Sequence, residues 1–389
     1  MRINPGGRLE FNDIVGRDAE ISRYWTILER QGLTLSAERR IGKTHIAIKM
    51  RESARPQFLP FYQDLEGVHS LKELLRSIYA TVERALSSSN RWKARLAKWV
   101  TLVPERIGGL DLSPLNAAWP ALLSTAFDDL VSIAGDQVIL MLWDEFPLMV
   151  YNISRREGES VAIELLDHLR ALRQRHFRNV RFLLTGSIGL HLVIRSLQRA
   201  GNANDPVNDL YSATVPEMSA EDTLRLARAL LEEVDVDSRH RNEIARSISE
   251  KVGGFPYYIH HVVDQLQQLH RKVISPDVDK AIDALIYDSQ DPANFRYYIN
   301  RISTYYDLPD QEIAYAILDA ICDCEHPQES AEIANLVRHR ISSASDEHVR
   351  SVLGLLVTDH YLEKQRHENA MCYRFRWILV KRWWKEARS

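Results

Sequence analysis

The chain has 389 residues, 45% of them hydrophobic and 26% charged, which is the composition of a globular protein large enough for two or three domains. Its formal net charge of -3 excludes binding to nucleic acid through overall positive charge, so such binding would need a local basic patch. Three cysteines exclude a disulfide framework, and the absence of an apolar run near the roughly 18 residues of a membrane span predicts a cytoplasmic protein outside the membrane.

The first half of the sequence alternates between strand and helix patterns. An arm rich in glycine and proline leads into a helix pattern from residue 18, and residues 33–36 then form a short apolar strand pattern before another helix. Further strands are predicted at 57–67, in the first half of the apolar run 137–150, and at 180–190, with helices at 70–86, 116–134 and 160–177. This alternation predicts an α/β fold with a parallel sheet. A basic segment at about 88–115 is predicted to be an insertion made of a helix and a loop or hairpin.

Strand patterns stop after Pro216. Helix patterns follow at 219–234, 238–252, 255–273 and 275–288, several of them beginning with a Ser or Asp that can cap the helix. From residue 307 onward the sequence predicts three helices, the third at 346–359, then two short strands across a polar turn and a last helix. Three helices followed by a hairpin are typical of a winged helix.

The stretch AERRIGKT, residues 37–44, lies between a predicted strand and a predicted helix, which is the position of a phosphate-binding loop. Gly42 would permit close approach of the backbone, Lys43 would supply positive charge to phosphates, and Thr44 would offer a hydroxyl to Mg²⁺. The motif G-x-x-x-x-G-K-[ST] has glycine where this chain has Ala37. We expect Ala37 to fit only with a negative φ, because a positive φ would cost about 1–2 kcal/mol. A Gly-Lys-Thr that begins a helix by chance is the alternative.

Two acidic residues end the most apolar strand pattern, about 100 residues after Lys43, a usual separation in such nucleotide-binding cores. Asp144 is predicted to position Mg²⁺, and Glu145 to act as the general base on the attacking water. Thr185 or Ser187, at the end of the next strand, could sense the γ-phosphate through a hydrogen bond. The carboxyl ends of parallel strands lie at one edge of a sheet, where α/β proteins bind ligands. The alternatives are acids that only cap a strand and a turn of small polar residues.

Six segments together resemble a known group of proteins: IVGRDAEI, SAERRIGKT, FYQDLEGVHSLKELL, LMLWDEF, LLTGS and GGFPYYIHH. They are similar to motifs of archaeal-type P-loop ATPases of the STAND branch, which are relatives of AAA+ and origin-recognition ATPases. The resemblance spans nearly the whole chain. It implies an α/β P-loop NTPase core with a parallel sheet (1–215), an α-helical lid (216–295), a C-terminal winged-helix domain (296–389), and a nucleotide-controlled switch that is often oligomeric.

The resemblance also implies where ATP and Mg²⁺ would bind. The segment Val15-Gly16-Arg17 would lie near the adenine, and the turn at residues 253–256 would lie in the lid near the nucleotide. Many relatives have Gly-x-Arg-Arg-x-Gly-Lys-Thr, which Arg39 and Arg40 match and Ala37 does not. Lys43 and Glu145 are the predicted catalytic residues, and Thr44 and Asp144 the predicted metal ligands. The predicted nucleotide-binding residues are Gly16, Arg17, Ala37, Glu38, Arg39, Arg40, Ile41, Gly42, Lys43, Thr44, His45, Thr185, Ser187 and Pro256.

Three functions are consistent with these patterns. The first is an ATP-driven switch with slow hydrolysis, which signals its state to a protein partner or to further copies of itself. The second is an ATP-gated DNA-binding protein of initiator or transposition-regulator type; the third predicted helix of the winged module is acidic at its start, which weakens this reading, whereas the last helix is basic. The third is a nucleotide-binding scaffold without turnover. An arginine finger, acting on a neighbouring copy, would come from one of Arg173, Arg175, Arg178, Arg195 and Arg199, although a solvated helix face is the simpler interpretation.

Overall fold

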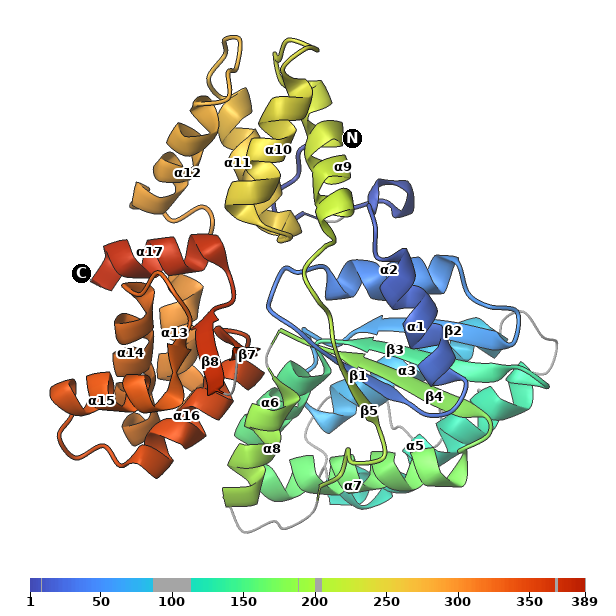
Figure 1. Ribbon diagram of the computed structural model, residues 1–389. Coiled ribbons are helices and arrows are strands. Elements are labelled where there is room, and N and C mark those ends of the chain that lie inside the picture. Colours follow the sequence, from blue (N-terminus) through green and yellow to red (C-terminus); the bar gives the residue numbers. More distant parts are fainter. Residues whose placement is uncertain (8, 87–112, 188, 200–204, 368–369, 389) are drawn as a thin grey trace. The chain divides into compact units, whose positions relative to one another are not determined.

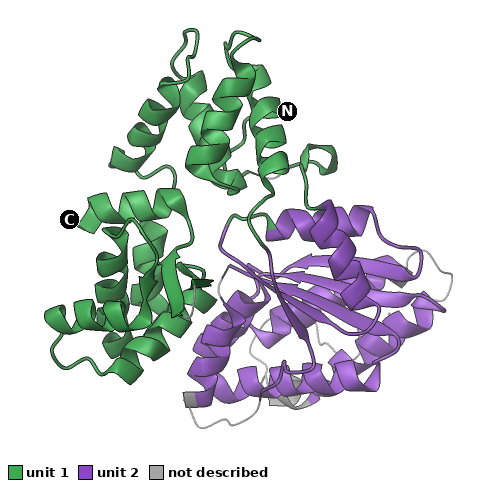
Figure 2. Ribbon diagram, viewed as in Figure 1, with its two compact units in different colours: residues 1–17, 40–42, 216–389 green, residues 18–39, 43–215 purple. Residues whose placement is uncertain are grey.

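The computed structural model describes residues 1–7, 9–86, 113–187, 189–199, 205–367 and 370–388 (Figure 1). The chain forms two compact units, coloured separately in Figure 2. The first, here called the sheet unit, comprises residues 18–39 and 43–215, and the second, the helical unit, comprises residues 1–17, 40–42 and 216–389. The predicted division of residues 216–389 into a lid and a winged-helix domain stays a prediction. The predicted basic insertion lies almost entirely outside the described residues.

The sheet unit is built on five parallel strands in the order β2-β3-β4-β1-β5. They are β1 (Leu33–Ser36), β2 (Phe58–Asp64), β3 (Val138–Asp144), β4 (Val180–Thr185) and β5 (Tyr211–Thr214). Strands β1 to β4 confirm the predicted strands. Strand β5 was not predicted; it lies at the edge of the sheet and buries only one of its four residues. Strands β3 and β4 are buried along nearly their whole length; β3 is apolar up to Asp144, and β4 is apolar apart from Arg181 and Thr185.

Helices cover both faces of this sheet. Helix α2 contacts β2, β3 and β4 from one face, whereas α5 and α6 contact the sheet from the other (Figure 1). The apolar run 137–150 is a strand only as far as Asp144, because Glu145 adopts a left-handed backbone (φ 56°) and Pro147 sits in the first turn of a helix. The helices of this unit are α1 (Asp18–Leu28), α2 (Lys43–Glu52), α3 (Leu71–Leu86), α5 (Ser113–Ala134), α6 (Phe146–Glu157), α7 (Glu159–Arg175) and α8 (Leu190–Arg199).

The helical unit contains the four predicted helices after residue 216, namely α9 (Ala220–Leu230), α10 (Arg241–Val252), α11 (Pro256–Gln267) and α12 (Asp277–Tyr287). Its C-terminal part has the winged-helix arrangement that the sequence predicted. The predicted hairpin β7-β8 follows α16, and a third short strand, β6, which the sequence did not predict, lies between α14 and α15 in the chain and pairs with β8 in the order β6-β8-β7. These elements are α13 (Arg296–Tyr305), α14 (Leu308–Cys322), β6 (Gln328–Glu329), α15 (Ser330–Arg340), α16 (Asp346–Thr358), β7 (Leu362–His367), β8 (Ala370–Phe375) and α17 (Ile378–Arg388). Short 3-10 helices occupy Phe11–Asp13 and Leu231–Glu233.

An aromatic cluster fixes α17 within the helical unit. Phe295 stacks on Trp383 at a ring distance of 5.8 Å, and Trp384 is fully buried 6.2 Å from the Phe375 ring on β8. The tryptophans at the end of the chain therefore belong to the core, where buried aromatic rings supply large apolar area. Among the helices described, none combines the length and the apolar character that a bilayer-spanning segment needs.

Candidate functional site at the carboxyl edge of the sheet

The loop between β1 and α2 curls around the side chain of its own lysine. Lys43, the first residue of α2, is only 6% exposed and donates hydrogen bonds of 2.8 Å from Nζ to the carbonyl oxygens of Ala37 and Glu38. Gly42 has a φ of 105°, and a side chain added there would meet no atom within 4 Å. The glycine is thus required by the backbone angle. The open space beside it leaves room for a ligand to approach the first N–H groups of α2, which carry the positive end of the helix dipole.

Ala37 occupies a position where the motif has glycine, and an alanine fits there only if its φ is not positive. The structure meets this condition. Ala37 is buried, and it is not among the residues with positive φ in the part of the chain that the structure describes. The left-handed residue of this loop is instead Arg40, with a φ of 67°. The alanine is therefore compatible with the loop without backbone strain.

Asp144, the last residue of β3, accepts hydrogen bonds on both carboxylate oxygens. Its Oδ2 accepts from the Thr44 hydroxyl at 2.5 Å and from the Tyr62 hydroxyl at 3.3 Å. Its Oδ1 accepts from the Glu145 N–H at 3.1 Å and from the Thr185 hydroxyl. Asp144 is 3% exposed, and these donors come from α2, β2, β4 and the turn after β3. The structure thus brings Thr44, Asp144 and Thr185 together as the sequence predicted, and it adds Tyr62.

Glu145 follows directly in a left-handed turn that aims its side chain toward the end of β4. Its carboxylate accepts from the backbone N–H of Ser187 at 2.9 Å and from the Ser187 hydroxyl at 2.7 Å. Burial raises the pKa of the Glu145 carboxyl; the bonds from Ser187 and the charge of Lys43 lower it, and the charge of Asp144 raises it further. A partly buried carboxylate next to a second acid and a lysine is the arrangement expected of a group that handles protons.

The remaining predicted residues divide between the two units. Glu38, Arg39 and His45 belong to the sheet unit with the residues above, whereas Gly16, Arg17, Pro256 and the loop residues 40–42 cluster with the helical unit. Within that unit, the buried Arg17 guanidinium donates to the carbonyls of Ile41 at 3.0 Å and Pro216 at 2.7 Å.

Gly16 and Pro256 have evident local roles in the helical unit. Gly16 has a φ of 73° and lies so close to the Asp222 carboxyl that a side chain would approach it to 2.7 Å. Pro256 begins α11, where its missing N–H is no loss. These contacts account for Gly16, Arg17 and Pro256 locally, and their predicted role toward adenine stays a prediction.

The oxygen atoms of Thr44 and Asp144 are suited to binding Mg²⁺. Among the residues that the structure describes, no group of three or more His, Cys, Asp or Glu side chains could hold a metal by itself. Mg²⁺ needs no such group, because it keeps several waters and binds through one or two protein oxygens and substrate phosphates. The Thr44 proton points at Asp144, which leaves the lone pairs of the Thr44 oxygen available to a cation.

Two of the five arginines near β4 that the sequence singled out pair with acidic side chains. Arg173 is buried and donates twice to Asp209 at 2.8 Å, and it also bonds the Pro206 carbonyl. This two-pronged pair stabilises the fold and makes Arg173 a poor candidate for a residue that reaches another molecule. Arg175 pairs with Asp128 at 3.1 Å. The side chain of Arg199 lies outside the described residues.

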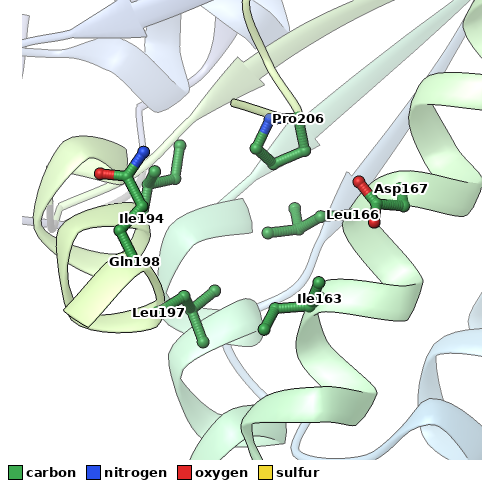
Figure 3. A pocket seen from close by; sticks show the side chains of 7 residues that line it. All are labelled: Ile163, Leu166, Asp167, Ile194, Leu197, Gln198 and Pro206. Atoms are coloured by element: carbon green, nitrogen blue, oxygen red, sulfur yellow. The ribbon is translucent and has the colours of Figure 1, made fainter. Parts of the chain in front are cut away.

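A small pocket in the sheet unit lies between α7 and α8, next to Pro206 (Figure 3). Its lining is mostly aliphatic, with one acid and one amide at its border. None of its residues belongs to the predicted nucleotide site, and an apolar pocket without a cation has nothing to hold a polyphosphate. The lining residues are Ile163, Leu166, Asp167, Ile194, Leu197, Gln198 and Pro206.

Comparisons with known proteins agree on the fold. The sequence matches no protein-family model and no curated protein. The structure is similar to that of the Walker-type ATPase PABY2304 of Pyrococcus abyssi, with a TM-score of 0.65 and 15% identity over 99% of this chain and 100% of that one. It is also similar to the ORC2 protein of Aeropyrum pernix, with a TM-score of 0.51 and 14% identity over 95% of this chain and 93% of that one. The chain therefore has the fold of this Walker-type ATPase and of the ORC2 protein, which agrees with the fold that the resemblance of its motifs predicted.

Proposed function

We propose that this protein is a switch ATPase that binds ATP with Mg²⁺ and hydrolyses it slowly, and whose nucleotide state controls a protein partner or its own assembly. One observation carries the proposal: Lys43, Thr44, Asp144 and Glu145 meet at the carboxyl edge of the sheet. Thr44 and Asp144, 100 positions apart in the chain, share a hydrogen bond there, which a chance Gly-Lys-Thr would not produce. The Aeropyrum pernix protein of the same fold is described in ADPNP-ADP complexes, which supports a nucleotide as the ligand.

ATP binding follows from the charges of the loop. Lys43 Nζ donates to two neutral carbonyl oxygens, and a phosphate oxygen would be a stronger, charged acceptor for the same protons. The N–H groups at the start of α2 would bind the phosphates that enter the open space beside Gly42. Thr44 and Asp144 fit Mg²⁺ by their oxygen donors and by the direction of the Thr44 proton. Bound Mg²⁺ would neutralise charge that develops on the β- and γ-phosphate oxygens.

Hydrolysis would depend on Glu145. A carboxylate with a raised pKa can take a proton from the water that attacks the γ-phosphorus. In the structure, both donors of Ser187 bind Oε2 of that carboxylate and hold it toward the end of β4. We propose that the carboxylate turns away from Ser187 to reach the attacking water; the loss of these charge-assisted hydrogen bonds would then make turnover slow.

Two helices of the winged-helix part bear on the DNA-binding alternative, α16 and α17. Three basic side chains of α17 pair with acids of their own unit: Lys385 with Asp323 at 3.1 Å, Arg388 with Asp319 at 2.6 Å, and Arg382 with Asp283. The fourth, Lys381, donates to the Cys324 carbonyl. On α16, Asp346 and Glu347 lie at the N-terminal end. Because this end is acidic and the α17 cations already have partners, the DNA-binding alternative gains no support from either helix.

Two substitutions test the proposal. Lys43→Ala should abolish binding of a fluorescent ATP analogue, whereas Glu145→Gln should keep binding and lose turnover, since it removes the base and preserves the shape of the side chain. ATP binding that is unchanged by Lys43→Ala would rule out this site. ATP binding without measurable turnover in the native protein would favour the nucleotide-binding scaffold.

A further inference from the structure

We propose that Tyr62 is a positioning residue for the metal side of this site: its hydroxyl holds Asp144 in the orientation that Mg²⁺ binding requires. The inference rests on the proposed function and extends it to a residue for which the sequence motifs predict no role. It begins from the hydrogen bond of 3.3 Å between the Tyr62 hydroxyl and Asp144 Oδ2.

Sheet register places Tyr62 on the correct face. Strands β2 and β3 pair in parallel, with Tyr62 opposite Leu142 and Asp64 opposite Asp144. Side chains two residues apart on a strand point to the same face, so Tyr62 stands one step below Asp144. Gln63, which lies between Tyr62 and Asp64, points to the opposite face, where it bonds Ser77 and Thr81 of α3. The phenol therefore reaches up the sheet toward the carboxylate.

The ring of Tyr62 is itself supported. The guanidinium carbon of Arg51, near the end of α2, lies 5.7 Å from the centre of the ring, within the range of a cation–π contact. Helix α2 thus contributes Thr44 at its start and Arg51 near its end, one to the carboxylate and one to the phenol. The half-buried Tyr62 side chain is held between the helix and Asp144.

The two carboxylate oxygens of Asp144 have different hydrogen-bond donors, and this difference gives Tyr62 a specific role. Oδ1 is fixed by Thr185 and by the backbone of Glu145, whereas Oδ2 takes both Thr44 and Tyr62. Thr44 is the predicted metal ligand and would share its oxygen with the cation. Tyr62 is the other hydroxyl on Oδ2, and its oxygen keeps lone pairs that can accept from a water. The phenol would therefore keep Oδ2 oriented once the cation is bound.

The test is the Mg²⁺ dependence of nucleotide binding in Tyr62→Phe, which removes only the hydroxyl. Partners that orient metal-binding carboxylates typically contribute 10–100-fold to metal affinity, and the long bond here places the expected loss at the lower end, about tenfold. Binding of a fluorescent ATP analogue is titrated with Mg²⁺, and in parallel with EDTA present. The expected result is a shift of the Mg²⁺ midpoint by about tenfold with binding in EDTA unchanged.

Tyr79→Phe is the matched control, because it also removes one tyrosine hydroxyl. The Tyr79 hydroxyl, on α3, donates to the carbonyl of Leu122, on α5, at 3.1 Å. It should leave the Mg²⁺ midpoint in place. An unshifted midpoint in Tyr62→Phe would overturn the inference while leaving the proposed function intact. Equal loss of binding with Mg²⁺ and with EDTA would also overturn it, since that indicates a general structural role. If the native protein binds no nucleotide under either condition, the proposed function itself fails.

Discussion

Replacement of Ser187 by alanine should accelerate ATP hydrolysis. In the structure the Ser187 hydroxyl donates to Glu145 at 2.7 Å, and the Ser187 backbone N–H donates to the same carboxylate oxygen at 2.9 Å. Alanine removes the first bond and keeps the second. The resting position of the carboxylate is thereby weakened, while the Glu145 side chain itself is kept.

The size of the effect follows from the bond that is lost. A hydrogen bond to a charged group contributes about 1.5–3 kcal/mol, and the freed carboxylate regains part of this from water. A net change near 1.4 kcal/mol corresponds to tenfold in the population of released Glu145. If release precedes the chemical step and the released form is a minor state, kcat rises by about the same factor.

Single-turnover and steady-state ATPase assays, together with ATP affinity, measure the change. Ser187→Thr is the control, because it keeps a hydroxyl and should keep the native rate. A kcat for Ser187→Ala that is equal to or below that of the native protein, with unchanged ATP affinity, would refute the resting-state argument. A lower ATP affinity would instead favour the predicted contact of Ser187 with the γ-phosphate.

Three further predictions come from the same structure. Burial raises the pKa of Glu145, and the base must be deprotonated to act. As the pH is lowered, kcat/KM should therefore begin to fall at a higher pH than an exposed glutamate would give. Loss of the Ser187 hydroxyl should move this acidic limb of the pH–rate profile to still higher pH. Ala37→Gly should destabilise the protein by about 0.4–1 kcal/mol in chemical denaturation, because it adds freedom to the unfolded chain and relieves no positive φ. Gel-shift assays at low salt, with and without ATP, should show no DNA retention, because the described cations of α17 are paired; ATP-dependent and salt-sensitive retention would revive the DNA-binding alternative.

The parts of the fold that could be predicted are those whose sequence pattern reflects their own burial. Strands β3 and β4 are mainly apolar because helices cover both faces, and α10 and α11 show their apolar side chains at helical spacing. Strand β5 could not be found in this way, since an edge strand with one buried residue carries no such pattern. The helical character of residues 146–150 was hidden for another reason. Their apolar sequence continues that of β3, and only the left-handed turn at Glu145 separates the two elements.

In the candidate site, too, some residues could be proposed from local sequence properties, whereas one contact depends on the pairing of strands. Lys43, Thr44, Asp144 and Glu145 could be proposed because their spacing and their places at element ends are local properties. The contact of Tyr62 with Asp144 depends on the register between β2 and β3, which no local pattern specifies.

For Arg173, the sequence suggested an exposed side chain that the structure shows to be buried. Its helix and basic neighbours suggest an exposed cation, yet Asp209, 36 residues later in the chain, buries it in a structural pair. Interactions between distant segments are therefore what the structure adds.

The missing glycine of the phosphate loop illustrates why a motif is better understood as a set of backbone requirements than as a string of letters. Gly42, whose φ is 105°, cannot be replaced without strain, and it is retained. At Ala37 the backbone does not enter the left-handed region, so a methyl group costs nothing in φ, and the buried side chain adds apolar contact. Arg40 has the left-handed angle within the same loop, at a cost of about 1–2 kcal/mol, and its guanidinium lies 4.3 Å from the centre of the Tyr257 ring in the helical unit. A cation–π contact of this kind is favourable, and the loop has the geometry that the proposed binding of phosphate by Lys43 and the start of α2 requires.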